Sequence, residues 1–157
     1  MRRAEQLSKV ADPFANPLGG GVMEVEMMDI ELLERNRVRF DVLVGEVLDA
    51  VDIDREENQI LLTTRSGRKF LVYHEQDCCE KVQIVGQDGS FDKLIGKPIV
   101  EARDIAVDTT EEGIDDSQTT TTLVFRVDDQ TVISRWVGDS NGYYSESVDI
   151  AELMSGG

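Results

Sequence analysis

The stretch Leu43-Val44-Gly45-Glu46-Val47-Leu48-Asp49-Ala50 reappears later in the chain as Leu94-Ile95-Gly96-Lys97-Pro98-Ile99-Val100-Glu101-Ala102. Both copies read Leu, a β-branched residue, Gly, two variable positions and an apolar pair. Each copy is followed by two apolar runs, a polar loop and a closing segment of the form Glu-Xaa-Val-Xaa-Ile, at residues 80–84 and 146–150. Such self-similarity indicates two copies of one supersecondary unit that share a core.

Each copy predicts four strands joined by hairpins, because short apolar runs alternate with turn signals such as Ser66-Gly67. The strands we expect are 46–53, 59–64, 69–73 and 80–85 in a unit of about 40–86, and 97–107, 121–127, 130–137 and 146–150 in a unit of about 91–150. The fold class is therefore mainly β and antiparallel, with α+β as the alternative. A sandwich, a barrel and a curved sheet all fit this pattern. We expect the two closing strands to be related by a pseudo-twofold axis.

The N-terminal part of the chain differs from the duplicated region. Residues 1–22 contain Pro13, Pro17 and three consecutive glycines at 19–21, which oppose regular structure, so we expect a flexible arm there. Residues 27–36 carry apolar side chains near helical spacing and predict one helix that covers a face of the sheet. Residues 23–157 are then a single domain.

The chain is strongly acidic. Its 157 residues include 32 Asp plus Glu and 16 Lys plus Arg, which gives a formal net charge of −16. This charge opposes direct binding to nucleic acid or to an anionic membrane surface, since both need cationic patches. It is compatible with a basic partner, with mimicry of the charge of DNA, or with solubility alone. No apolar run follows Arg2-Arg3 as in a signal peptide, so we expect a cytoplasmic protein.

The loop before the first closing strand gathers groups that can bind metals. His, thiolate and carboxylate side chains can all coordinate zinc; here they are His74, Asp77, Cys78, Cys79 and Glu80. Adjacent residues of an extended segment point to opposite faces, so the two cysteines are poorly placed to share one ion. We therefore predict no cofactor and keep zinc as the alternative. Because a disulfide between neighbours needs unusual geometry, we expect both thiols to be reduced.

Two other interpretations of this loop stay open. His74 is the only histidine and could activate Cys78 as a nucleophile, since a thiolate needs a base within hydrogen-bond reach. Alternatively, one cysteine packs as a small core residue and His74 bonds to a neighbouring carboxylate or backbone group.

The second loop is rich in residues that favour molecular contacts. Asn141-Gly142 predicts a turn, and Tyr143 and Tyr144 follow it. Together with Trp136, these tyrosines offer a large contact area at a small cost in conformational entropy. The alternative is that Trp136 and one tyrosine belong to the core. The binding residues we predict are Trp136, Asn141, Tyr143, Tyr144, His74 and Asp77.

Each closing segment begins with a glutamate, Glu80 in the first unit and Glu146 in the second. A carboxylate at this position can accept hydrogen bonds from backbone amides of its own loop. We therefore expect a structural role for both glutamates.

Two segments carry a family resemblance: His74-Glu75-Gln76-Asp77-Cys78-Cys79-Glu80, and the run from Arg135 to Glu146 that contains Gly138-Asp139-Ser140-Asn141-Gly142-Tyr143-Tyr144-Ser145-Glu146. With Leu94-Ile95-Gly96, they resemble a family of small uncharacterised proteins of tailed bacteriophages. The resemblance covers about Phe40 to Ile150. It implies an accessory protein made in the cytoplasm of an infected bacterium and brings no established activity with it.

We expect a non-enzymatic binding module that acts on a host factor, in host takeover or in defence against host immunity. The acidic surface favours a host protein with a basic, nucleic-acid-binding face. One alternative is a small metal- or thiol-dependent enzyme centred on His74–Glu80. Another is a virion or assembly component, for which the N-terminal arm is the only hint.

Overall fold

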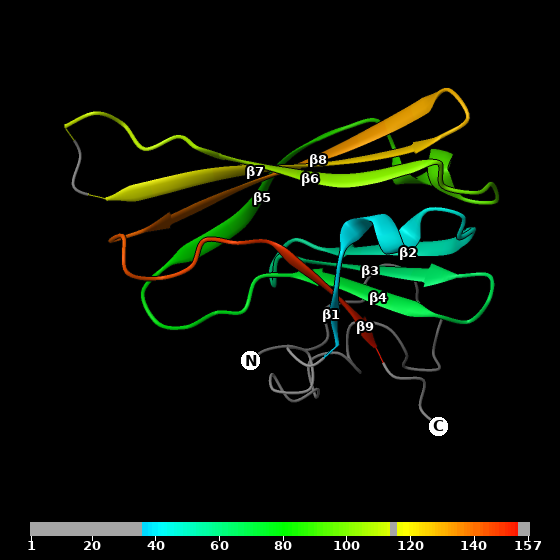
Figure 1. Ribbon diagram of the computed structural model, residues 1–157, viewed down its shortest axis with the longest axis horizontal. Coiled ribbons are helices and arrows are strands. Elements are labelled where there is room, and N and C mark those ends of the chain that lie inside the picture. The colour runs from blue at the N-terminus through cyan, green and yellow to red at the C-terminus, as the bar shows by residue number, and fades with distance from the viewer. Residues whose placement is uncertain (1–35, 114–115, 154–157) are drawn as a thin grey trace.

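The computed structural model describes residues 36–113 and 116–153, and these form two antiparallel sheets (Figure 1). The elements in chain order are β1 (Arg37–Val38), the 3₁₀ helix η2 (Phe40–Leu43), β2 (Leu48–Asp54), β3 (Gln59–Thr64), β4 (Lys69–Tyr73), β5 (Lys81–Asp88), the 3₁₀ helix η3 (Phe91–Leu94), β6 (Glu101–Asp108), β7 (Ser117–Val127), β8 (Gln130–Ser140) and β9 (Asp149–Leu153). The mainly β prediction is confirmed. The predicted arm at 1–22 lies outside the described residues, as does the predicted helix apart from Asn36.

The two sheets exchange their closing strands. One sheet has the order β1-β9-β4-β3-β2 and the other has the order β5-β8-β7-β6. The hairpin strands β2, β3 and β4 of the first unit are thus joined by β9 of the second unit. In the same way, β5 of the first unit pairs with β8 of the second. Neither unit completes its own sheet.

A pair of reciprocal hydrogen bonds relates the two units, as the repeat predicts. The amide of Gly45 donates to the carbonyl of Ile99 at 2.8 Å, and the amide of Gly96 donates to the carbonyl of Leu48 at 3.0 Å. Both glycines have φ of 93°, a backbone conformation that favours glycine. Equivalent positions in the two copies therefore contact each other across a pseudo-twofold axis.

One hydrophobic core lies between the sheets and draws residues from both. Leu48 and Phe70 come from the first sheet, and Phe125 and Trp136 come from the second. Trp136 is fully buried, and its indole N–H donates to the hydroxyl of Ser134 at 3.0 Å. This corrects the prediction that Trp136 belongs to the contact surface. The alternation of Val132, Ser134 and Trp136 on β8 places all three on the core side.

Strands β7 and β8 of the second sheet are longer than predicted, whereas β6 begins at Glu101 instead of Lys97. β7 begins at Ser117 instead of Thr121, and β8 continues to Ser140 instead of ending at Val137. The polar run at 117–122 is rich in threonine, whose β-branched side chain suits a pleated sheet. Because β7 pairs with β6 on one side and β8 on the other, its polar residues still lie in the middle of a sheet.

We predict that Gly138→Ala destabilises the fold by about 1–3 kcal/mol, because an added methyl group would overpack a crowded site. A Cβ at this position would lie 2.8 Å from Cβ of Glu146 and 3.1 Å from Cγ2 of Val82. Urea unfolding followed by circular dichroism would measure the change. Gly86→Ala is the matched control, since its Cβ would have Cβ of Arg135 at 3.9 Å as its nearest neighbour. An unchanged unfolding midpoint in Gly138→Ala would contradict the crowding.

Candidate functional site: the two crossovers

The segments that carry the chain from one sheet to the other lie side by side. They are residues 74–80, between β4 and β5, and residues 141–148, between β8 and β9. Figure 1 shows both at the same end of the two layers. The Nδ1–H group of His74 donates to the carbonyl oxygen of Ser147 at 2.7 Å and ties the segments together. The two loops singled out in the sequence therefore meet, and together we call them the crossover pair.

The carboxylate of Glu80 organises the first crossover. It accepts hydrogen bonds from the amide of Asp77 at 2.7 Å, from the amide of Cys78 at 3.1 Å and from Nε2 of His74 at 2.7 Å. The side chain of Glu80 is 0% exposed and that of His74 is 4% exposed. The prediction that Glu80 binds backbone amides of its own loop is confirmed.

These contacts determine the charge state of Glu80. Burial alone would raise the pKa of Glu80, but the hydrogen bonds from Asp77, His74 and Cys78 outweigh it and lower the pKa to about 2. Both ring nitrogens of His74 face acceptor oxygens, one on Glu80 and one on Ser147. The ring of His74 is therefore held between the two crossovers by a hydrogen bond from each of its nitrogens.

Glu146 has the equivalent place in the second crossover but different partners. Its Oε1 accepts from the hydroxyl of Thr119 at 2.6 Å, and its Oε2 accepts from the hydroxyl of Ser140. The Ser140 oxygen in turn accepts from the amide of Gly142 at 3.0 Å. Hydroxyl groups thus take the place of the backbone amides that we predicted for this glutamate. The structural role is the same, because the buried carboxylate holds the turn that follows β8.

Cys78 and Cys79 form a disulfide, which corrects the prediction of two reduced thiols. The unusual geometry that a disulfide between neighbours needs is the reason to expect reduced thiols, whereas this part of the crossover is bent by its amide bonds to Glu80. Both residues are exposed, so neither is the small core residue considered as an alternative. Neither cysteine of the chain is free to act as a nucleophile in this state.

The weak zinc candidates His74, Cys78, Cys79 and Glu80 do not assemble into a metal site. Within residues 36–113 and 116–153, no three His, Cys, Asp or Glu side chains are grouped so as to hold an ion. The described part of the chain also has no helix with the length and hydropathy needed to cross a membrane.

The remaining predicted binding residues lie on the surface of the crossover pair. The side chain of Tyr143 is the most prominent, with 88% of the residue exposed. Asn141 and Asp77 are exposed and Tyr144 is half-buried. The side-chain oxygen of Asn141 accepts from the amide of Tyr143 at 3.0 Å, so the turn holds Tyr143 in place.

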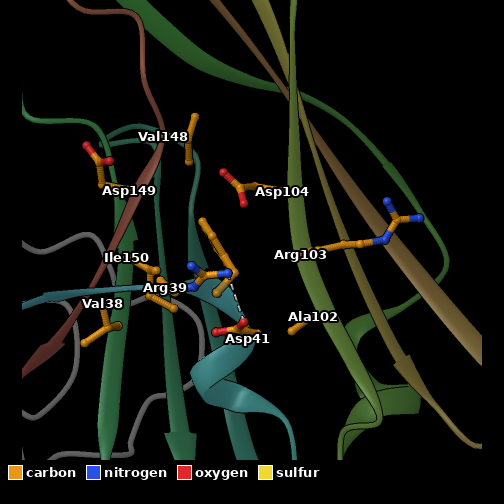
Figure 2. Close-up of a pocket in the computed structure, with 10 residues that line it drawn as sticks. Val38, Arg39, Asp41, Ala102, Arg103, Asp104, Val148, Asp149 and Ile150 are labelled. Atoms are coloured by element: carbon orange, nitrogen blue, oxygen red, sulfur yellow. Dashed lines mark ion pairs between the residues drawn. The ribbon is translucent and has the colours of Figure 1, made fainter.

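A groove that the sequence did not predict runs beside the second crossover. Its first part is a cavity of about 270 Å³ between β6, η2 and the start of β9 (Figure 2). Its second part, of about 430 Å³, is lined by Tyr144, Ser145 and Glu146, among others. Asp104, Val148 and Asp149 line both parts. The one sequence signal for this groove is Asp104, a carboxylate on the same face of its strand as Ala102 and Ala106.

The groove presents more negative than positive charge. In Figure 2 the carboxylate of Asp104 lies at the cavity, while the side chain of Asp149 points to the other side of β9 and Arg103 points away from the cavity. Arg103 is paired with Glu101 at 2.6 Å. Arg39 is paired with Asp41 at 3.3 Å, which offsets its charge. An approaching cation would therefore meet the carboxylate of Asp104 in this groove.

The fold and the crossover pair define a class of protein: a duplicated two-sheet β domain with exchanged closing strands. The chain matches the model of a domain of unknown function, DUF7448, over residues 32–150. It belongs to this family. No curated protein and no solved structure matches it.

We predict that acid weakens the fold through Glu80. Its pKa of about 2 in the folded state lies below its ordinary value of 4.5. The ionised carboxylate therefore stabilises the fold fully above pH 4.5, and this contribution is lost as the pH falls through 2. Urea unfolding midpoints measured from pH 7 to pH 2 would show the decline.

Glu80→Gln is the variant that isolates this effect. Its unfolding midpoint should be below that of the parent protein at pH 7, because the amide cannot replace the charge facing His74. The gap should narrow as the pH approaches 2. A gap that stays constant across this range would assign the acid sensitivity to other groups.

Proposed function

We propose that the protein is a phage-encoded accessory protein that binds a host protein without catalysing a reaction. The single observation that carries the proposal is that the crossover pair keeps its acid–base side chains bonded inside the molecule and exposes side chains suited to binding. The titratable groups His74, Glu80 and Glu146 are occupied by hydrogen bonds inside the molecule. The groups that face outward, Tyr143 and Asn141, are of the kind that make contacts.

The partner we propose has a basic surface. The chain carries a net charge of −16, and the groove beside Tyr144 adds the carboxylate of Asp104. A basic host protein, for example one that binds nucleic acid, would be attracted by this field. Tyr143 would then supply an aromatic anchor at the edge of the groove. The phage origin rests on the sequence resemblance, and the proposed location in the host cytoplasm rests on that resemblance and on the lack of an apolar run after Arg2-Arg3.

We predict that Tyr143→Ala weakens partner binding by about 30-fold, the loss typical of an aromatic residue at the centre of an interface. The measurement is retention of proteins from an infected-cell lysate on the tagged full chain at about 50 mM salt, where charge-driven contacts are strong. The retained protein would be identified, purified and titrated against each variant. Raising the salt to about 0.5 M should release it.

Gln130→Ala is the matched control, since Gln130 is exposed, uncharged and at the opposite end of β8 from the crossover. It should bind as the parent protein does. Equal affinity of Tyr143→Ala and Gln130→Ala would remove Tyr143 from the interface. An absence of any retained protein at low salt would overturn the proposed function.

A further inference from the structure

The outer edge of β6 belongs to no ladder among the described strands, although the 3₁₀ helix η2 packs against this strand. β6 ends the four-stranded sheet of order β5-β8-β7-β6, and no described strand pairs with its other side. Every residue from Arg103 to Asp108 is exposed. The exposed set includes two large apolar side chains, Ile105 at 37% and Val107 at 52%. An open edge of this length is a template for another strand.

The hydrogen bonds of β6 show which of its backbone groups face the open edge. The amide of Thr109 donates to the carbonyl of Gln118 on β7 at 2.8 Å, in the register that pairs Asp108 with Thr119. In an antiparallel ladder, the residues that bond to one neighbour alternate with those directed to the other side. Odd-numbered residues of β6 therefore bond to β7. The residues with backbone N–H and C=O groups directed to the open edge are Ala102, Asp104, Ala106 and Asp108.

We propose that β6 pairs with β6 of a second copy of this chain, antiparallel and about a twofold axis at Ile105. The two four-stranded sheets then join into one continuous sheet. The alternation of backbone groups requires the axis to pass through a residue and not between two residues. An axis at Arg103 or at Asp104 would place a charged side chain opposite its own copy. An axis at Ala106 would place Asp104 opposite Asp108.

The axis at Ile105 avoids these like-charge contacts while keeping most of the strand paired. Ile105 lies opposite Ile105 of the second copy, and the two exposed side chains bury each other. Asp104 lies opposite Ala106, and Arg103 lies opposite Val107. Directly opposed like charges destabilise a sheet, whereas opposed β-branched residues stabilise it. This register therefore combines backbone hydrogen bonds with an apolar centre.

The pairing has a distinctive dependence on salt. Each chain carries a net charge of −16, so two copies repel each other at long range. Backbone hydrogen bonds and the contact at Ile105 do not depend on attraction between opposite charges. Added salt screens the repulsion and should strengthen the dimer. Binding of a basic partner should instead weaken with salt, so this inference and the proposed function can fail independently.

The test is sedimentation equilibrium of the full chain at about 10–200 µM protein and at about 50 and 300 mM salt. The parent protein should show a monomer–dimer equilibrium that shifts toward the dimer at the higher salt. Ala106→Pro should lower the association constant at least tenfold, because proline removes an N–H group that faces the open edge and puts its ring there. It leaves the bonds to β7 in place. Ala106→Ser keeps the N–H group and should associate as the parent does.

A second variant keeps the test decisive if Ala106→Pro does not fold. Ile105→Lys places two like charges on the axis and should also abolish the dimer. Its control is Val85→Lys, which adds the same charge to β5, at the opposite edge of the same sheet, where Val85 is 54% exposed. A parent protein that is monomeric at every concentration would overturn the proposal. So would a folded Ala106→Pro or Ile105→Lys variant that dimerises as well as its control.

Discussion

Each sheet depends on a strand that comes from the other half of the chain. β9 lies between β1 and β4, and β5 pairs with β8. The backbone groups along β4 and β8 would be left without partners in a half that folded alone, and unpaired backbone groups in an interior are costly. The exchange therefore makes the duplicated units one cooperative structure. The reciprocal hydrogen bonds of Gly45 and Gly96 also join the two units, near the beginning of each repeat.

The exchange also creates the candidate site, because both crossovers must pass the same end of the sandwich. Each crossover contains a buried carboxylate, which is stable in the interior only where hydrogen bonds surround it. Glu80 gathers two amides and the imidazole ring of His74, and Glu146 gathers two hydroxyl groups. Loops held in this way lose little conformational freedom when they bind, which favours Tyr143 as a rigid anchor. The duplication has thus produced two crossovers that are both held by a buried glutamate but expose different side chains.

The features that could be predicted from the sequence are those that depend on short stretches of chain. The strands β3 and β4 were predicted with their observed bounds, and the repeat predicted the pseudo-twofold relation of the units. The exchange of closing strands was not predictable. The alternation of apolar and polar residues shows that a segment is a strand, but it does not show which strand it pairs with. The neighbouring tyrosines in the sequence led to the prediction that Trp136 lies on the surface. In the structure, Trp136 is one of the alternate residues of β8 that face the core. The disulfide between Cys78 and Cys79 was not predicted, because a bridge between neighbours needs unusual geometry and the sequence does not show the bend that the bonds to Glu80 impose.

The position of β9 has a consequence for the order in which the fold can form. It is the last of the described strands along the chain, yet it lies inside the first sheet, where Leu153 pairs with Lys69 and Ala151 pairs with Arg37. A ribosome releases the hairpin of β3 and β4 well before β9 exists. Until then one side of β4 is an unprotected edge, and pairings between segments so distant in sequence form slowly. The growing chain must remain soluble in this unfinished state, and its excess of negative charge provides the repulsion that keeps neighbouring chains apart.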